Sequence, residues 1–270
     1  MNAFCKESRV ADSPKGDILR SIMANISVRR VFMKTVKVLF LLALTPGFLV
    51  LSCQSTPTDV GKIDLFFDMG ENPPVLGTDY EQFEGQWAVK NGVFEFNSYP
   101  PADGVSMESK IHFLNTEMVN GTLELDLMGI DGFTNAQGEL DKQGNVGFLF
   151  RARDFKLGAD NVRGYYVGVG QNEAKEWIVE AAYYGPGWIP IWQGNRIEGT
   201  PPFHLTVTMV DEYVTAVVTN GSKEVYNDTF QTSRYGSLTF GDVGLRTWIA
   251  NGNVGNIKIT NIGSGLDHEN

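Results

Sequence analysis

The chain has 270 residues, a formal net charge of −10 and 42% hydrophobic residues, which indicates a packed, acidic protein rather than a disordered one. The acidic balance argues against nucleic acid or an anionic membrane surface as a partner, and it is compatible with a neutral sugar or with calcium. Both cysteines, Cys5 and Cys53, precede the predicted folded part, which therefore has neither a disulfide nor a thiolate nucleophile.

The first informative segment predicts a secretory signal. Lys34 and Lys37 lead into an apolar run that Pro46-Gly47 interrupts and that ends in Val50-Leu51-Ser52-Cys53. A basic region followed by a short apolar region is typical of a signal peptide, and the run is too short to cross a bilayer comfortably.

The end of this segment resembles a bacterial lipobox, in which the cysteine becomes the lipid-bearing first residue. The resemblance implies lipid attachment at Cys53 and a place in the bacterial cell envelope, tethered to a membrane. Gln54, the next residue, favours the outer over the inner membrane. The alternatives are an ordinary secretory signal, or an uncleaved anchor.

Five segments follow from this interpretation. A signal should begin the chain, so residues 1–32 are expected to be a mis-assigned start or a disordered extension, with Met33 or Met23 rather than Met1 as the initiator. The predicted order is this extension, a signal peptide (33–52), a polar tether (53–61), one folded domain (62–263) and a tail (264–270).

The folded domain reads as about a dozen short strands without a helical period. Alternation is clear at 121–128, and Asn91-Gly92 between 87–89 and 93–96 predicts a tight hairpin. Asp211-Glu212, Asn220-Gly221 and Asn251-Gly252 are also expected to be turns. The other predicted strands are 63–67, 105–111, 145–153, 165–169, 176–183, 189–193, 203–210, 213–219, 224–230, 243–249 and 254–262. Such a series predicts an all-β, two-sheet antiparallel sandwich.

Several of these strands resemble those of concanavalin A-like jelly rolls. The segment from Trp87 matches an opening W-x-V-x-x-G-x-L hairpin, and those from Asn145 and Gly164 match N-x-G-I-x-F-R and G-Y-x-V-x-I strands. Residues 243–248 and 255–259 resemble the closing pair. Within that group the chain is most similar to 3-keto-disaccharide hydrolase-like domains and to levan-binding-type carbohydrate modules. The resemblance covers most of residues 62–262 and implies a ligand on the concave face.

Alternation assigns faces to the strands that would form this concave sheet. With Phe148 and Phe150, Val167, Val179 and Leu245 in the core, one surface is predicted to gather the candidate carbohydrate-binding residues Arg151, Tyr166, Glu180, Arg246 and Trp248. Aromatic rings cover the apolar faces of sugars, and charged groups bond their hydroxyls. The alternative is a structural ion pair between Arg151 and Glu180.

Trp188 and Trp192 belong to a Gly-Pro-rich aromatic segment, 183–192. They are candidates for an aromatic platform at the edge of the groove, and the alternative is a hydrophobic mini-core beneath a hairpin.

Catalysis by a jelly-roll glucanase requires carboxylates spaced as E-x-D-x-x-E or E-x-D-x-E. Glu124 and Asp126 begin such a motif, but Met128 and Gly129 stand where the last Glu belongs, so the motif is incomplete. Glu180 is the remaining candidate acid or base. The keto-hydrolase-like family typically has a Glu and a Gln after its G-Y pair, whereas this chain departs from the pattern after Gly164-Tyr165.

These observations predict an envelope lipoprotein, expected to be monomeric, whose partner is an oligo- or polysaccharide. A glycoside hydrolase of the 3-keto-disaccharide hydrolase-like type is the first alternative, and a structural or adhesive protein is the second. The resemblance makes calcium a candidate cofactor, with Asp64 and Asp68 as candidate ligands and solvated surface carboxylates as the alternative.

Overall fold

The computed structural model describes residues 62–98, 108–134, 140–142, 144–158, 160–172, 174–185 and 187–262, all within the compact unit Thr56–Asn270. Apart from one 3-10 turn, Thr232–Arg234, every regular element in these ranges is a strand. No helix there is long and apolar enough to cross a membrane. The predicted signal peptide, Cys53, the tether and the tail lie outside the described residues.

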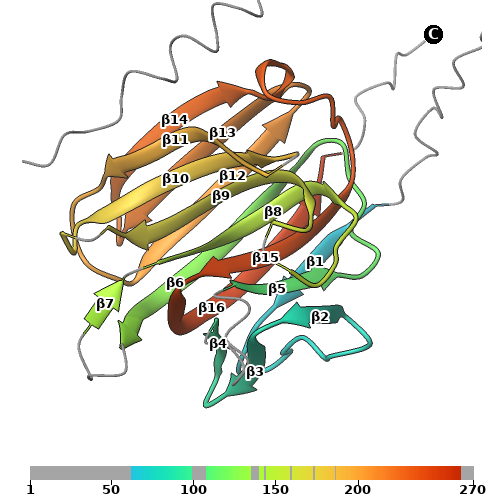
Figure 1. Cartoon of the computed structure of the whole chain (residues 1–270). Helices are drawn as coiled ribbons and strands as arrows, with labels where there is room; N and C mark the ends of the chain where they lie inside the picture. The colour runs from blue at the N-terminus through green and yellow to red at the C-terminus, as the bar shows by residue number, and fades with distance from the viewer. Residues whose placement is uncertain are drawn as a thin grey trace, which may run out of the picture. The chain divides into compact units, whose positions relative to one another are not determined.

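The strands form two antiparallel sheets stacked face to face, which confirms the predicted all-β jelly-roll sandwich (Figure 1). In the described residues the larger sheet has nine strands. Its main path runs in the order β14 (Lys223–Gln231), β13 (Tyr213–Asn220), β12 (Phe203–Val210), β6 (Gly121–Thr134), β16 (Ala250–Asn261), β4 (Val93–Asn97) and β3 (Gln86–Lys90). Off this path, β1 (Asp64–Phe67) pairs with β16 and β7 (Leu140–Lys142) pairs with β6.

The smaller sheet has seven strands in the described part of the chain. Its order is β11 (Trp188–Arg196), β10 (Trp177–Tyr184), β9 (Arg163–Gln171), β8 (Asn145–Arg153), β15 (Asp242–Trp248), β5 (Glu108–Phe113) and β2 (Tyr80–Glu84). β10, β9, β8 and β15 are consecutive neighbours, which places the four segments of the predicted site side by side.

The hydrophobic core lies between the sheets because the inward positions of both are apolar. Leu205 and Val207 of β12 alternate with half-buried threonines, and they share one buried cluster with Phe148, Val167 and Val179 of the smaller sheet. The unit therefore has its own core, which an independently folding domain requires.

A second buried cluster covers the outer face of the seven-stranded sheet. Leu149, Tyr166, Ala182 and Tyr184 form it with Ala152 and Val162, and Phe155 and Trp188 pack against it. Strands buried on both faces lose the strict apolar–polar alternation. The middle of β8 and β9 is accordingly buried at nearly every position.

Two of the predicted turn pairs behave differently. Asn91 and Gly92 both have positive φ, 52° and 73°, and they join β3 to β4, so this hairpin is confirmed. The prediction of a turn at Asn251-Gly252 is wrong, because both residues lie inside β16. A Cβ at Gly252 would lie 2.2 Å from the carbonyl oxygen of Gly129, so glycine there allows the close approach of β16 to β6.

Candidate functional site

A pocket of about 460 Å³ opens on the outer face of the seven-stranded sheet. This volume is within the range of small-molecule sites. We call it the outer pocket. It is lined by residues from β8, β9, β10, β11 and β15 and from the loops beside them: Gly144, Asn145, Asp160, Gln171, Asn172, Ile178, Glu180, Trp188, Gln193, Arg246 and Trp248.

Arg246 lies in the wall of the outer pocket and is 3% exposed. Its Nε donates a hydrogen bond of 2.8 Å to Oε1 of Glu108, and its Nη2 lies 3.7 Å from Asp160. Its guanidinium carbon lies 5.5 Å from the ring centre of Trp188 and 5.3 Å from that of Trp248. Cation–π contacts of this kind fix the direction of the guanidinium. The two indoles are therefore held on a charged centre at the wall of the pocket.

Buried charges near the pocket attach Gly158 and Asp160, which lie between β8 and β9, to the sheet. Lys110, which is fully buried, lies 3.4 Å from Glu84 and 3.5 Å from Glu108, and its Nζ donates to the carbonyl of Gly158 at 2.8 Å. The amide of Asp160 donates to Oε2 of Glu108 at 3.0 Å. Because buried charges must be paired, this network fixes the loop and brings Asp160 to the rim.

A second network holds Glu180. Asn145 Nδ2 donates to Oε2 of Glu180 at 2.5 Å, and the hydroxyl of Tyr166 donates to Oδ1 of Asn145 at 2.8 Å. Tyr166 is fully buried, so it orients Asn145 from below the pocket floor. The side chain of Glu180 is thereby fixed in one position, as recognition of a ligand hydroxyl requires.

Both carboxylates of the outer pocket have perturbed acidity. Burial raises the pKa of Glu180, although the bond from Asn145 and the charge of Arg246 oppose the rise. Burial likewise raises the pKa of Asp160, against the charge of Arg246. Perturbed carboxylates in one pocket are frequent at functional sites, and structural networks produce them too.

The structure brings four of the predicted residues to one pocket: Glu180, Arg246, Trp248 and Trp188 all line it. Tyr166 lies on the predicted face but beneath the others, where the guanidinium of Arg246 is 5.6 Å from its ring centre.

The prediction that Arg151 shares this face was wrong. Arg151 has a φ of +47° at an irregularity in the β8–β9 pairing, which turns its side chain inward and places Ala152 in the outer cluster instead. It is fully buried, and its guanidinium donates to the carbonyls of Val119 and Asp211. Arg151 therefore ties β8 to loops of the nine-stranded sheet. It does not pair with Glu180.

Trp192 does not line the outer pocket with Trp188. The β10–β11 pairing shifts register on both sides of Ala181, the partner of Trp192, and Trp192 packs against Tyr226 and Phe230 of β14. The predicted aromatic segment therefore supplies Trp188 to the outer pocket and Trp192 to the contact with β14.

The sequence did not predict a role in the site for Asn145, Asp160 or Glu108. Asn145 opens the strand that resembles the N-x-G-I-x-F-R motif, but the resemblance assigned no role to its side chain, and Asp160 lies in a loop without periodicity. Glu108 and Lys110 are two charges two residues apart in a strand that ends in Ile111, His112 and Phe113, and this was the signal that could have indicated a buried ion network.

The incomplete glucanase motif lies on the other sheet. Glu124 and Asp126 belong to β6 of the nine-stranded sheet, where Glu124 pairs with Lys258 at 2.8 Å and Asp126 with Nδ1 of His204 at 2.7 Å. They contribute nothing to the outer pocket.

The candidate calcium ligands do not fit a metal site. Asp64 lies 3.7 Å from Lys62, and Oδ1 of Asp68 accepts bonds from the amides of Gly70 and Glu71. Among the residues that the structure describes, no group of three or more His, Cys, Asp or Glu side chains is placed to hold a metal ion.

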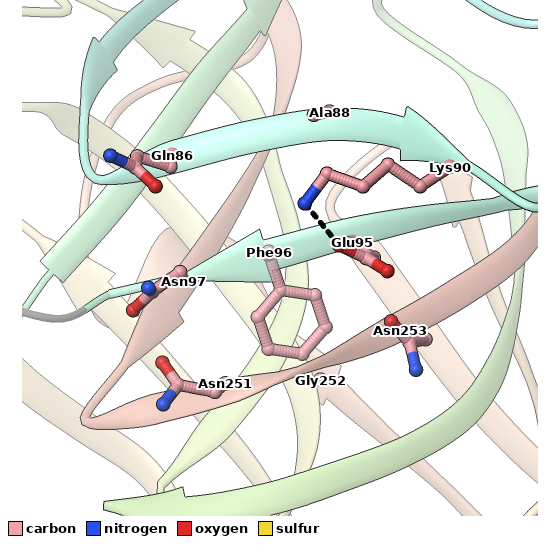
Figure 2. A pocket seen from close by; sticks show the side chains of 9 residues that line it. All are labelled: Gln86, Ala88, Lys90, Glu95, Phe96, Asn97, Asn251, Gly252 and Asn253. Carbon is pink, nitrogen blue, oxygen red and sulfur yellow. Dashed lines mark hydrogen bonds and ion pairs between the residues drawn. The ribbon is translucent and has the colours of Figure 1, made fainter.

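A separate hollow of about 320 Å³ lies on the nine-stranded sheet, where β3, β4 and β16 are neighbours (Figure 2). Register places Gln86, Asn97 and Asn251 in one row across these strands, and Lys90 and Glu95 form an ion pair at 2.6 Å. Its described lining contains no tryptophan or tyrosine. Its one aromatic lining residue, Phe96, is buried, so this hollow lacks the exposed indole surface of the outer pocket.

This chain is similar to known proteins in structure but matches none of them in the comparisons by sequence. No family model and no curated protein matches the chain. The carbohydrate binding module CBM66 from Bacillus subtilis is 15% identical, with a TM-score of 0.45, over 68% of this chain and 98% of that chain. The exoplasmic/lumenal domain of VIP36, in its Ca2+/Man3GlcNAc-bound form, is 10% identical, with a TM-score of 0.48, over 74% and 88%. A lectin from Bauhinia forficata in complex with GalNAc is 11% identical, with a TM-score of 0.43, over 75% and 99%. Similarities this distant say nothing about what this chain binds.

Proposed function

We propose that this protein binds a neutral carbohydrate in the outer pocket, and that it does so as an envelope lipoprotein anchored through Cys53. The observation that carries the binding proposal is the joining of two indoles, Trp188 and Trp248, to fixed polar groups in one pocket. Indole faces pack against the apolar C–H faces of a sugar ring, and a fixed carboxylate and amide bond its hydroxyls.

The charges of the pocket favour a neutral ligand. Arg246 is already neutralised by Glu108, and Asp160 and Glu180 leave the rim acidic. An anionic ligand would meet these carboxylates without a free cation among the lining residues, at a cost in affinity. A hydroxyl, in contrast, donates to a carboxylate and accepts from the amide of Asn145.

A role in adhesion to another protein would predict a flat apolar surface here. The surface is instead hollowed, and it carries the charged side chains of Asp160, Glu180 and Arg246.

The binding test uses the Thr56–Asn270 unit on an array of neutral glycans, followed by calorimetry on each binder. Trp248→Ala should weaken the binding at least tenfold without changing the melting temperature by more than a few degrees, since Trp248 is only partly buried. Phe66→Ala is the matched control, because Phe66 is an aromatic residue of β1 that is 49% exposed and lies on the other sheet. Equal affinity of wild type and Trp248→Ala would remove the outer pocket from the proposal.

The anchoring part has a separate test. Cells that express the full chain should incorporate labelled palmitate into it, and Cys53→Ala should abolish the label. Label retained in Cys53→Ala would contradict lipid attachment at this residue.

Glycoside hydrolysis is the second candidate, because the structure brings Asp160 and Glu180 to the same pocket. Glycosidases use two carboxyl groups, one of which holds its proton at neutral pH, and burial raises the pKa of both groups here. If the protein is an enzyme, Glu180→Gln should retain glycan affinity and lose cleavage of the bound glycan, measured by chromatography of the products. Unchanged glycan after prolonged incubation with the wild type would exclude this candidate for that ligand.

A further inference from the structure

A second groove lies where the edges of the two sheets meet. β11 is an edge strand of the seven-stranded sheet and β14 an edge strand of the nine-stranded sheet, and Figure 1 shows them beside each other. Asn195 Nδ2 donates across this seam to the hydroxyl of Tyr226 at 2.9 Å. The ring of Trp192 meets Tyr226 and Phe230 edge to face, with centroid distances of 5.7 and 5.0 Å. The groove has a volume of about 310 Å³, and we call it the edge groove.

The edge groove has an aromatic lining. Trp192, Tyr213 and Tyr235 line it above Phe230, and Tyr213 is 52% exposed. Edge contacts with Phe230 hold the rings of Trp192 and Tyr235 in place. Rings that are held rigidly and remain partly exposed lose little conformational entropy when a ligand covers them.

Polar groups at the rim of the edge groove are also fixed. Arg234 Nε donates to Oε1 of Gln231 at 3.1 Å, and the side chain of Gln231 is hydrogen-bonded to Glu212. The exposed Thr229 adds a hydroxyl. Fixed amide and guanidinium groups beside aromatic faces repeat the combination found in the outer pocket.

The outer pocket and the edge groove share strand β11. Trp188 and Gln193 of β11 line the outer pocket, and Trp192 lines the edge groove. Four residues of strand span about 13 Å, so the two tryptophans lie within reach of one extended ligand. The register shifts beside Ala181 allow β11 to serve both hollows.

We propose that the edge groove is a second subsite for the same neutral polysaccharide that the outer pocket binds, so that a long glycan is held on both sides of β11. This inference rests on the proposed function. It predicts a gain in affinity with ligand length, because the second contact is made within an already bound chain.

The test compares short and long ligands on the Thr56–Asn270 unit. The probes are levan, mixed-linkage β-glucan, galactomannan and arabinoxylan in affinity gels, and their di- and trisaccharides in calorimetry. Tyr213→Ala and Arg234→Ala change exposed side chains outside the core. Each should weaken binding of the retained polymer about tenfold and leave disaccharide affinity within twofold of wild type. Phe66→Ala should change neither.

The outcomes separate the two proposals. If Trp248→Ala weakens both polymer and disaccharide while Tyr213→Ala and Arg234→Ala leave polymer binding within twofold of wild type, the edge groove is not a subsite. If wild type binds none of the probes, the proposed function and this inference both fail for these glycans. Equal loss of disaccharide and polymer affinity in Tyr213→Ala would also overturn the inference, because it would show one site rather than two.

Discussion

Replacing Arg246 with methionine tests how the charged network beneath the outer pocket is held together. Methionine keeps an unbranched apolar stem of similar reach among the surrounding rings, and it removes the positive charge. Arg246 is 3% exposed and bonds to Glu108, which is 1% exposed. The variant therefore leaves a buried carboxylate without its closest cation.

The loss in free energy of unfolding follows from the removal of this positive charge. Removing one partner of a buried ion pair costs about 3–5 kcal/mol. Lys110 remains 3.5 Å from Glu108, so the lower end, about 3 kcal/mol, is expected here. For a domain of roughly this size, that loss lowers the melting temperature by about 6–12 °C.

The assay is urea unfolding of the Thr56–Asn270 unit followed by tryptophan fluorescence and circular dichroism. With a slope of about 2–3 kcal/mol per M, the midpoint should fall by about 1 M. Arg246→Lys keeps the charge and loses the planar fork, so it should cost less than the methionine variant.

The double variant Arg246→Met/Glu108→Leu completes the test. The double variant also removes the buried carboxylate that Arg246→Met leaves with Lys110 as its remaining ion-pair partner, so it should be more stable than Arg246→Met alone. A loss below about 1 kcal/mol in Arg246→Met, or a double variant less stable than the single one, would refute the pairing as the reason for the cost.

Three further changes have expected outcomes. Burial raises the pKa of Glu180 in the folded state above its ordinary value of 4.5, so as pH rises from about 4.5 towards 7 wild type should lose stability relative to Glu180→Gln. The two proteins should converge near pH 4, and a pH-independent difference in urea midpoint would contradict this. Asn145→Ala removes the hydrogen-bond partner of both Tyr166 and Glu180, so the free energy of unfolding measured in urea should fall by about 1–3 kcal/mol. An unchanged free energy of unfolding would show that this network does not stabilise the fold. Gly252→Ala places a Cβ 2.2 Å from the carbonyl oxygen of Gly129, so about 1–3 kcal/mol should be lost, and an unchanged melting temperature would show that β16 shifts freely.

Alternation along regular strands predicted much of the site. Glu180, Arg246 and Trp248 lie on β10 and β15 where pairing with β9, β8 and β5 is uninterrupted, so a period of two places each side chain correctly. β9 and β8 join these strands in one sheet. Sheet order could not be read from the residues, and the resemblance to a known fold implied only two sheets with a ligand on the concave face.

Prediction failed where the backbone departs from that period. Arg151 adopts positive φ at an irregular step, which no local residue pattern indicates for an arginine. Trp192 follows two register shifts that depend on pairing with β10. Asp160 reaches the pocket because buried Glu108 and Lys110 hold its loop, and such long-range contacts have no local signature.

Carbohydrate binding in the outer pocket is tested by calorimetric titration of the Thr56–Asn270 unit, as wild type, Trp248→Ala and Phe66→Ala, with neutral glycans retained on an array. We expect wild type and Phe66→Ala to bind the same glycan with equal affinity, and Trp248→Ala to bind it at least tenfold more weakly while keeping its fold by circular dichroism. Equal binding by all three proteins, or retention of no neutral glycan by wild type, would contradict carbohydrate binding in this pocket.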